Sequence, residues 1–269
     1  MQLLIQHSTV YRYSMPLSYS IQQLRLTPRS EKHQQILQWQ IRSAGELQAA
    51  RDAYGNAVHL LTVSGPHTEL SIHAQGRISV VSPPQGRISD ADSLPPAVFT
   101  VAGRYTSATE SITGFAHRYL GVSHPDTAAA LKLAEAIRHA VRYRSGATGV
   151  SSSADDALQL GLGVCQDHAH VYLACCHVAG IPARYVSGYI DPASGEHAAS
   201  HAWVDVWVQD QAYHGWVSID VTHACLMNDR YCRLAVGRDY DSAGPVRGIR
   251  RGGGEESMSV VVQVIPQTD

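Results

Sequence analysis

The sequence has no long run of apolar residues. None of its 269 residues belongs to a stretch that could span a bilayer as a helix. The first residues, Met1 to His7, also lack the basic start and the long apolar segment of a secretory signal. We therefore expect a cytoplasmic protein that has no membrane partner.

Charge is also scarce. Only 16% of the residues are Asp, Glu, Lys or Arg, and the formal net charge is −2. This balance excludes strong electrostatic attraction to a polyanion, so we expect no nucleic-acid partner. A hydrophobic content of 44% is typical of a globular protein, and the length is sufficient for two domains.

The sequence also lacks a disulfide pattern. Its five cysteines are an odd number, and Cys175 and Cys176 are neighbours in an apolar segment. Such usage is typical of a reducing compartment, which agrees with the cytoplasmic expectation.

Residues 1–95 have the pattern of short β-strands. Apolar residues alternate over Ile36–Ile41 and over Glu69–Val81, and Gly, Asn and Pro mark the turns between strands. No group of nucleophiles, bases or metal ligands is clustered in this region. A proline-rich connector, residues 82–96, follows it. We predict an antiparallel, sandwich-like β domain over 1–95 and a second domain over 96–269 that includes the C-terminal strand.

The second region begins with helical patterns at 107–120, 125–142 and 154–160, and these lead to Cys165. Gly161 and Gly163 allow a tight turn immediately before it. The residues after it are apolar and alanine-rich until Gly180 and Pro182, which end a helix. Cys165 is therefore expected at the N-terminus of a buried helix, where free N–H groups and the helix dipole favour a thiolate.

A strand after this helix carries a candidate base. Over 200–208, Ala and Val residues alternate with His201, Trp203, Asp205 and Trp207. A turn near Asp210 and the strand that ends at Asp220 follow. Antiparallel pairing around that turn brings Asp220 within reach of His201. Asp205 is on the same strand as His201, about 13 Å from it, and is a poor partner.

Cys165, His201 and Asp220 are the residue types that a base-assisted nucleophile requires. Cys165 would attack, His201 would carry the proton, and Asp220 would orient the imidazole. The backbone N–H of Cys165 would stabilise an oxyanion. Three other histidines are rival bases, and His168 is the strongest of them because it is within one helical turn of the thiol. The other two are His170 and His197.

The order of the motifs resembles the transglutaminase-like superfamily, in particular its bacterial members with an N-terminal β domain. The resemblance covers residues 105–260 well. The motifs that carry it are Gly163–Asp167, Gly180–Tyr189, Ser200–Val204, Ile219–Asp220, Ala235–Tyr240 and Pro245–Gly248. The family aspartate is often followed by Pro-Thr, and here Val221 stands in place of the proline, before Thr222, which puts the local turn geometry in doubt.

The resemblance implies an α+β fold with a papain-like core, in which a nucleophile helix packs on an antiparallel sheet. It also implies a triad of Cys165, His201 and Asp220, no cofactor, and a bacterial cysteine protease, amidase or acyltransferase. The substrate would be a peptide or protein amide, and a primary amine is a possible acceptor. We expect substrate contacts from four neighbours of the triad: Gln166, Asp167, His168 and Trp203.

Two alternatives remain open at this point. The same fold serves non-catalytic binding or scaffold modules, because fold alone does not fix function. A metal site could use Cys165, His168, His170 and His201, with His223 and Cys225 nearby. However, no paired short spacing of Cys and His ligands is present, so we expect no metal. The three tryptophans Trp203, Trp207 and Trp216 either line a dry cleft or serve as packing residues.

Overall fold

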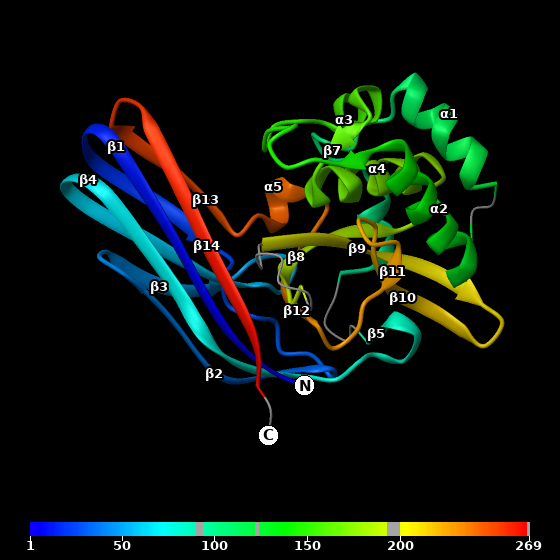
Figure 1. Ribbon diagram of the computed structural model, residues 1–269, viewed down its shortest axis with the longest axis horizontal. Coiled ribbons are helices and arrows are strands. Elements are labelled where there is room, and N and C mark those ends of the chain that lie inside the picture. The colour runs from blue at the N-terminus through cyan, green and yellow to red at the C-terminus, as the bar shows by residue number, and fades with distance from the viewer. Residues whose placement is uncertain (90–93, 122–123, 193–199, 268–269) are drawn as a thin grey trace.

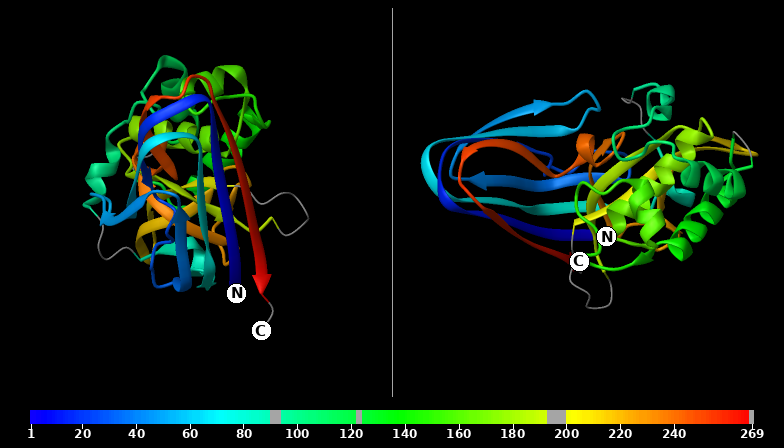
Figure 2. Two further views of the ribbon diagram at one scale, coloured as in Figure 1. Left: turned by 90° about the vertical axis from the view of Figure 1, so that its left-hand side faces the viewer. Right: turned by 90° about the horizontal axis from the view of Figure 1, so that it is seen from above.

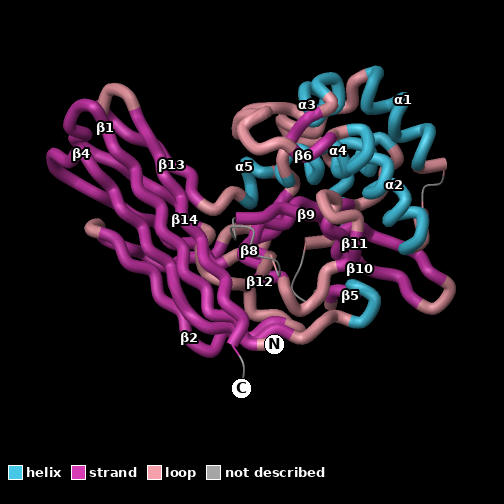
Figure 3. The backbone as a smooth tube through the Cα atoms, viewed as in Figure 1, coloured by secondary structure: helices cyan, strands magenta, loops and turns pink. Residues whose placement is uncertain are grey.

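The computed structural model describes residues 1–89, 94–121, 124–192 and 200–267. Two antiparallel sheets lie next to each other, and the helices cover one side of the second sheet (Figures 1 and 3). This is the α+β class expected from the sequence. Within the described residues, no helix has both the length and the apolar character needed to cross a bilayer.

The first sheet is built around two long strands, β1 (Gln2–Leu24) and β4 (Ala57–Val80). On the far side of β4 lie β2 (Gln34–Ser43) and β3 (Glu46–Arg51). On the far side of β1 lie β13 (Val246–Gly252) and β14 (Glu256–Gln267). In Figure 2 the start of β1 and the end of β14 therefore lie side by side, and Gln2 pairs with Gln267.

This sheet differs from the expected domain in two respects. The described strands of the N-terminal region form one sheet, and its inner face packs against the second sheet through residues such as Leu3, Ile5, Tyr189 and Leu234. The second sheet therefore buries the inner face that another sheet of the N-terminal region would cover in a sandwich. In addition, the C-terminal strand pairs with β1 instead of with the core, which corrects the assignment of all of 96–269 to the second domain.

The second sheet has the order β11-β10-β9-β8-β12, with β5 added beside β10. Alternating apolar residues on these strands face the helices on one side. The elements are β5 (Arg87–Ile88), β8 (Ala183–Ile190), β9 (Ser200–Asp210), β10 (Tyr213–Asp220), β11 (Cys225–Leu226) and β12 (Tyr231–Gly237).

The helices follow the apolar patterns of the sequence closely. Thr109, Asp126 and Ser153 accept hydrogen bonds from backbone N–H groups at the starts of the first three α-helices, as expected for N-caps. The helices are α1 (Glu110–Tyr119), α2 (Thr127–Ala140), α3 (Ala154–Leu160), α4 (Cys165–Val178) and α5 (Tyr240–Ala243), with the 3-10 turns η1 (Pro84–Gly86) and η2 (Pro96–Thr100). A short parallel pair, β6 (Arg142–Tyr143) and β7 (Leu162–Gly163), precedes α4.

Buried charges join the two sheets. Arg233 on β12 lies 2.9 Å from Glu31 of the N-terminal region and forms two hydrogen bonds with Asp205 on β9. The Asn56 side chain donates to the carbonyl of Val236 and accepts from its N–H. These contacts fix the first sheet relative to the strands that carry the site.

Candidate active site

Cys165 is the first residue of α4 and is partly exposed. Gly161 ends α3 in the left-handed conformation at φ 65°, a conformation that favours glycine. Gly163 lies so close to Asp167 that a Cβ atom at this position would be 2.9 Å from Oδ2. The Asp167 carboxylate accepts hydrogen bonds from the Val164 N–H at 2.7 Å and from the Thr148 hydroxyl. Asp167 thus holds the turn that presents the thiol.

His201 on β9 connects the thiol to Asp220 on β10. Its Nε2 atom lies 2.7 Å from Oδ2 of Asp220, and the imidazole lines the same cavity as the Cys165 side chain and interacts with it electrostatically. Because Nε2 is engaged by the carboxylate, Nδ1 is the nitrogen left for the thiol. The structure therefore brings the three predicted residues together in the order required for assisted nucleophilic attack.

The local electrostatics favour a charged pair. Burial opposes a positive charge on His201, but the Asp220 carboxylate and the Cys165 side chain outweigh this effect and raise the pKa of His201 to about 10. Burial likewise opposes the charge on Asp220, whereas His201 and His223 hold the pKa of this carboxyl well below its usual range. Asp220 therefore stays ionised and keeps the imidazole protonated over a wide pH range.

Two further residues bind the Asp220 carboxylate. The Tyr231 hydroxyl donates to Oδ2 at 2.8 Å, and Nδ1 of His223 lies 2.7 Å from the same oxygen. Sequence reasoning did not assign either residue to the triad. His223 follows Asp220 by three residues, a spacing that can return a side chain to a carboxylate. Tyr231 comes from another strand and gives no local signal.

The residues considered as an alternative set of metal ligands do not converge. His168 and His170 have separate partners inside the core, as described below. His201, Asp220 and His223 do have ligand atoms within 4.8 Å of one another and could hold an ion. Their 2.7 Å contacts to the shared carboxylate oxygen have hydrogen-bond geometry and account for the cluster without a metal.

The rival bases have other partners. His168 is fully buried; its Nε2 lies 2.7 Å from the Val141 carbonyl and its Nδ1 lies 2.9 Å from the Thr222 hydroxyl. His170 is also buried, stacks on Tyr105, and accepts a hydrogen bond from the backbone of Tyr240. His197 lies outside the described residues.

A cavity of about 730 Å³ lies beside Cys165 and His201. Of the four predicted substrate contacts, only Gln166 lines it. Asp167, His168 and Trp203 are at most 1% exposed and support the site from behind, which corrects their assignment as substrate contacts. The reason is that the helix and the strand turn these side chains toward the core. Most of the other lining residues come from α4, β8, β9, α5 and the first sheet.

Two regions of the chain match known family models. Residues 3–79 match the bacterial transglutaminase-like N-terminal region, and residues 113–221 match the transglutaminase-like superfamily. An uncharacterized protein of Mycobacterium leprae is 32% identical over 274 residues, which cover 96% of each chain. The chain belongs to the transglutaminase-like superfamily.

Two other proteins are similar to this transglutaminase-like chain. The solved structure of a candidate cysteine protease from Cytophaga hutchinsonii has a TM-score of 0.79 at 21% identity, and covers 100% of this chain and 92% of its own. That likeness shows the fold. A protein-glutamine gamma-glutamyltransferase of Pseudomonas aeruginosa is 34% identical over 85 residues, 29% of this chain and 12% of its own length.

The turn after Asp220, in which Val221 replaces the usual proline, keeps the neighbouring contacts of the site. Thr222 supplies the hydroxyl that holds His168. Ala224 then adopts a positive φ of 52°, and the turn returns the chain toward β11. The His223 N–H donates to Oδ1 of Asp220 at 3.1 Å. The turn without proline therefore still holds the carboxylate.

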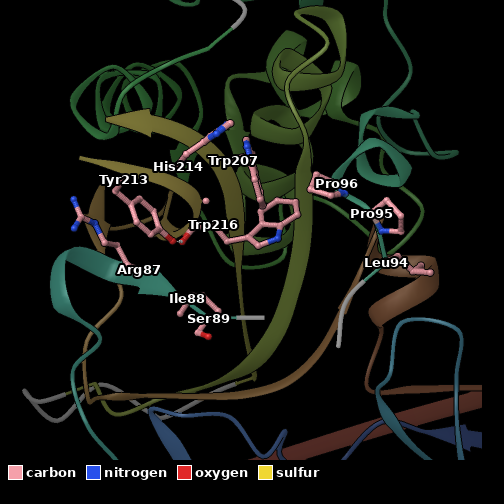
Figure 4. Close-up of a pocket in the computed structure, with 11 residues that line it drawn as sticks. Arg87, Ile88, Ser89, Leu94, Pro95, Pro96, Trp207, Tyr213, His214 and Trp216 are labelled. Carbon is pink, nitrogen blue, oxygen red and sulfur yellow. Dashed lines mark hydrogen bonds between the residues drawn. The ribbon is translucent and has the colours of Figure 1, made fainter. Parts of the chain in front are cut away.

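The tryptophans do not line the cavity at Cys165. Trp203 is buried, donates to the Ser218 hydroxyl at 2.9 Å, and stacks on His201. Trp207 and Trp216 line a different cavity, of about 520 Å³, together with Tyr213 and Arg87 (Figure 4). Trp203 thus has a packing role, and Trp207 and Trp216 are not part of the cleft at the thiol.

Proposed function

We propose that this protein is a cysteine-dependent acyl enzyme that acts on amide or peptide bonds through Cys165, His201 and Asp220. The observation that carries the proposal is the position of His201, which bonds the buried carboxylate of Asp220 and lies with Cys165 at the wall of one cavity. Membership of a superfamily with a cysteine-protease-like fold agrees with it. A non-catalytic module has no need of this arrangement.

In the first half of the reaction, the Cys165 thiolate attacks the amide carbonyl and forms a C–S bond. The negative charge on oxygen is stabilised by the backbone N–H of Cys165, which has no acceptor within the helix because it lies in the first turn. The C–N bond then breaks as His201 gives its proton to the leaving amine. A thioester on Cys165 and a free amine result.

In the second half, water or a primary amine attacks the thioester. His201 accepts a proton from the attacking group, the C–S bond breaks, and the thiolate is restored. Asp220 remains ionised and stabilises the imidazolium throughout. No step requires a cofactor. Transfer to an amine is included because of the local likeness to a protein-glutamine gamma-glutamyltransferase.

The decisive experiment is intact-mass spectrometry of a panel of glutamine- and amide-containing peptides, incubated with the protein with and without a primary amine. Wild type is compared with Cys165→Ala. Free acids that are lost in the variant identify a hydrolase, and amine adducts that are lost in the variant identify an acyltransferase. Equal product masses with wild type and Cys165→Ala would refute the proposal and favour a scaffold role.

The remaining expectations accompany this proposal. The partner is a peptide or protein amide, with no nucleic-acid or membrane partner, and the location is cytoplasmic, in line with five cysteines that are all free in the structure. Gln166 stays the predicted substrate contact from α4, because it lines the cavity next to the thiol.

A further inference from the structure

The wall of the cavity opposite α4 belongs to the first sheet. β1 contributes His7, Thr9 and Tyr11 to the cavity lining, and β14 contributes Val260 and its neighbours. The register pairs Val262 with His7, Val260 with Thr9 and Met258 with Tyr11. These residues therefore share one face of the sheet, the inner face toward Cys165.

The β14 part of this wall is apolar and partly exposed to the cavity. Met258 is 56% exposed and Val260 is 44% exposed, whereas Val262 is 7% exposed. Exposed large apolar side chains that gather in a concave site are typical of ligand contact. Their location in the same cavity as Cys165 and His201 makes the wall continuous with the candidate active site.

The polar members of the wall carry no charge at neutral pH. Both ring nitrogens of His7 are engaged, by the Tyr189 hydroxyl and by the Thr9 hydroxyl, each at 2.7 Å. Burial lowers the pKa of His7 to about 4, and burial raises the pKa of Tyr11. Among the described residues that line the cavity, no Asp, Glu, Lys or Arg is present.

We propose that β14 is the specificity-determining wall of the site, and that it selects acyl donors whose group beside the scissile carbonyl is uncharged and apolar. This inference rests on the proposed function and adds the substrate class. A charged group against Met258, Val260 and Val262 would lose water without gaining a partner from that wall. An apolar group would be stabilised by contact with Met258, Val260 and Val262. The N-terminal sheet thus has a direct part in substrate choice.

The test uses two neutral thiol reagents with the same reactive group: iodoacetamide and N-benzyl iodoacetamide. The rate of alkylation at Cys165 is measured by mass spectrometry with peptide mapping. For each thiol, we take the ratio of the alkylation rate with the benzyl reagent to the rate with iodoacetamide. We expect this ratio to be about tenfold or more larger for Cys165 of the wild type than for glutathione. Equality with the glutathione ratio would overturn the inference.

Matched variants on β14 make the test specific. Val260→Asp places a carboxylate in the wall and is expected to reduce the preference for the benzyl reagent to the glutathione value. Ser259→Asp places the same group at the adjacent residue, which is exposed and does not line the cavity, and should keep the wild-type preference. Val260→Thr keeps the side-chain shape and should give a smaller loss. A preference that survives Val260→Asp would overturn the inference.

The peptide panel then separates this inference from the proposed function. Donors that carry Leu beside the acyl carbon should be processed about tenfold or more faster than donors that carry Glu or Lys. Equal rates for these donors in wild type would overturn the inference, while the acyl chemistry would stand. Benzyl preference without any Cys165-dependent product would refute the acyl chemistry and leave the apolar cavity wall supported.

Discussion

The imidazole of His201 lies 2.7 Å from the carboxylate of Asp220, and this contact joins two neighbouring strands of the second sheet. The carboxylate is fully buried, whereas the imidazole borders the cavity. The core thus holds the Asp220 carboxylate in a fixed position, and the carboxylate orients the His201 imidazole, which faces the cavity. Four predictions follow from this arrangement and from the elements that support it.

Asp220→Asn should reduce turnover of the substrate by about 10³–10⁴-fold, because the amide can hold the wrong tautomer of His201 and cannot stabilise imidazolium. The measurement is kcat with the best donor of the peptide panel, together with a circular dichroism spectrum to verify folding. Asp210→Asn is the matched control, since Asp210 pairs with Thr127 and Arg87 away from the cavity. A loss of activity of less than tenfold in Asp220→Asn would contradict the assigned role.

The stability of the fold should fall on both sides of a neutral window. The pKa of Asp220 is lowered from 3.8, so its stabilising charge is present above pH 3.8 and is lost as the pH falls below that value. The pKa of His201 is raised from 6.5 to about 10, so its contribution is complete below pH 6.5 and is lost as the pH rises through about 10.

Urea unfolding at pH 6.5 and at pH 10 checks the alkaline side of this prediction. The wild type should lose more free energy of unfolding over that range than Asp220→Asn, in which the carboxylate that raises the pKa of His201 is absent. Equal losses in the two proteins would show that the pair does not stabilise the charged imidazole.

Asp205→Ala should destabilise the fold by about 3–5 kcal/mol, because it leaves two buried guanidinium groups without their shared carboxylate. The partners are Arg184 at 2.8 Å and Arg233 at 2.7 Å, and all three side chains are fully buried. The exposed pair Arg12–Glu69 supplies the control, and Glu69→Ala should cost about 0–1 kcal/mol. Urea denaturation midpoints measure both, and similar values would contradict the prediction.

Gly163→Ala should impair both the reactivity of Cys165 and the stability of the fold. Its Cβ would lie 2.8 Å from Cβ of Asp167, so the carboxylate that holds the turn before Cys165 must move. A displacement of the thiol by about 1 Å can cost about 10²-fold in rate, whereas such overpacking costs about 1–3 kcal/mol. The rate of Cys165 alkylation and the melting temperature measure the two effects.

Gly149→Ala is the matched control for this variant, because nothing lies within 4 Å of the position that its Cβ would take. It should leave the alkylation rate at the wild-type value. If Gly163→Ala alkylates as fast as Gly149→Ala, then Asp167 does not control the position of the thiol.

The local elements of the second region could be predicted well from the sequence. Residues 154–160 form α3, as their helical pattern indicates, and the alternation over 200–208 lies within β9. The position of Cys165 at the start of α4 followed from glycines before it and apolar residues after it. These signals are local, because caps, turns and periodicity depend on neighbours in the sequence.

The long-range contacts could not be predicted in the same way. Alternation shows which side chains share a face of β9, but it does not show what covers that face, so Trp203 was expected near substrate and is buried instead. Alternation in β14 likewise does not identify β1 as its partner. Tyr231 reaches Asp220 from another strand, and no spacing in the sequence indicates this contact.

The pairing of β14 with β1 also fixes when the cavity is completed during synthesis. During synthesis, β1, the helix α4 that carries Cys165, and the strands β9 and β10 leave the ribosome before β14, because β14 follows all of them in the chain. Until then the valine wall is missing and the edge of β1 that it covers is open. Contacts between such distant segments form late, since a long loop must close first. The emergence of β14, and not the folding of the catalytic half, is therefore the step that closes the cavity around the thiol.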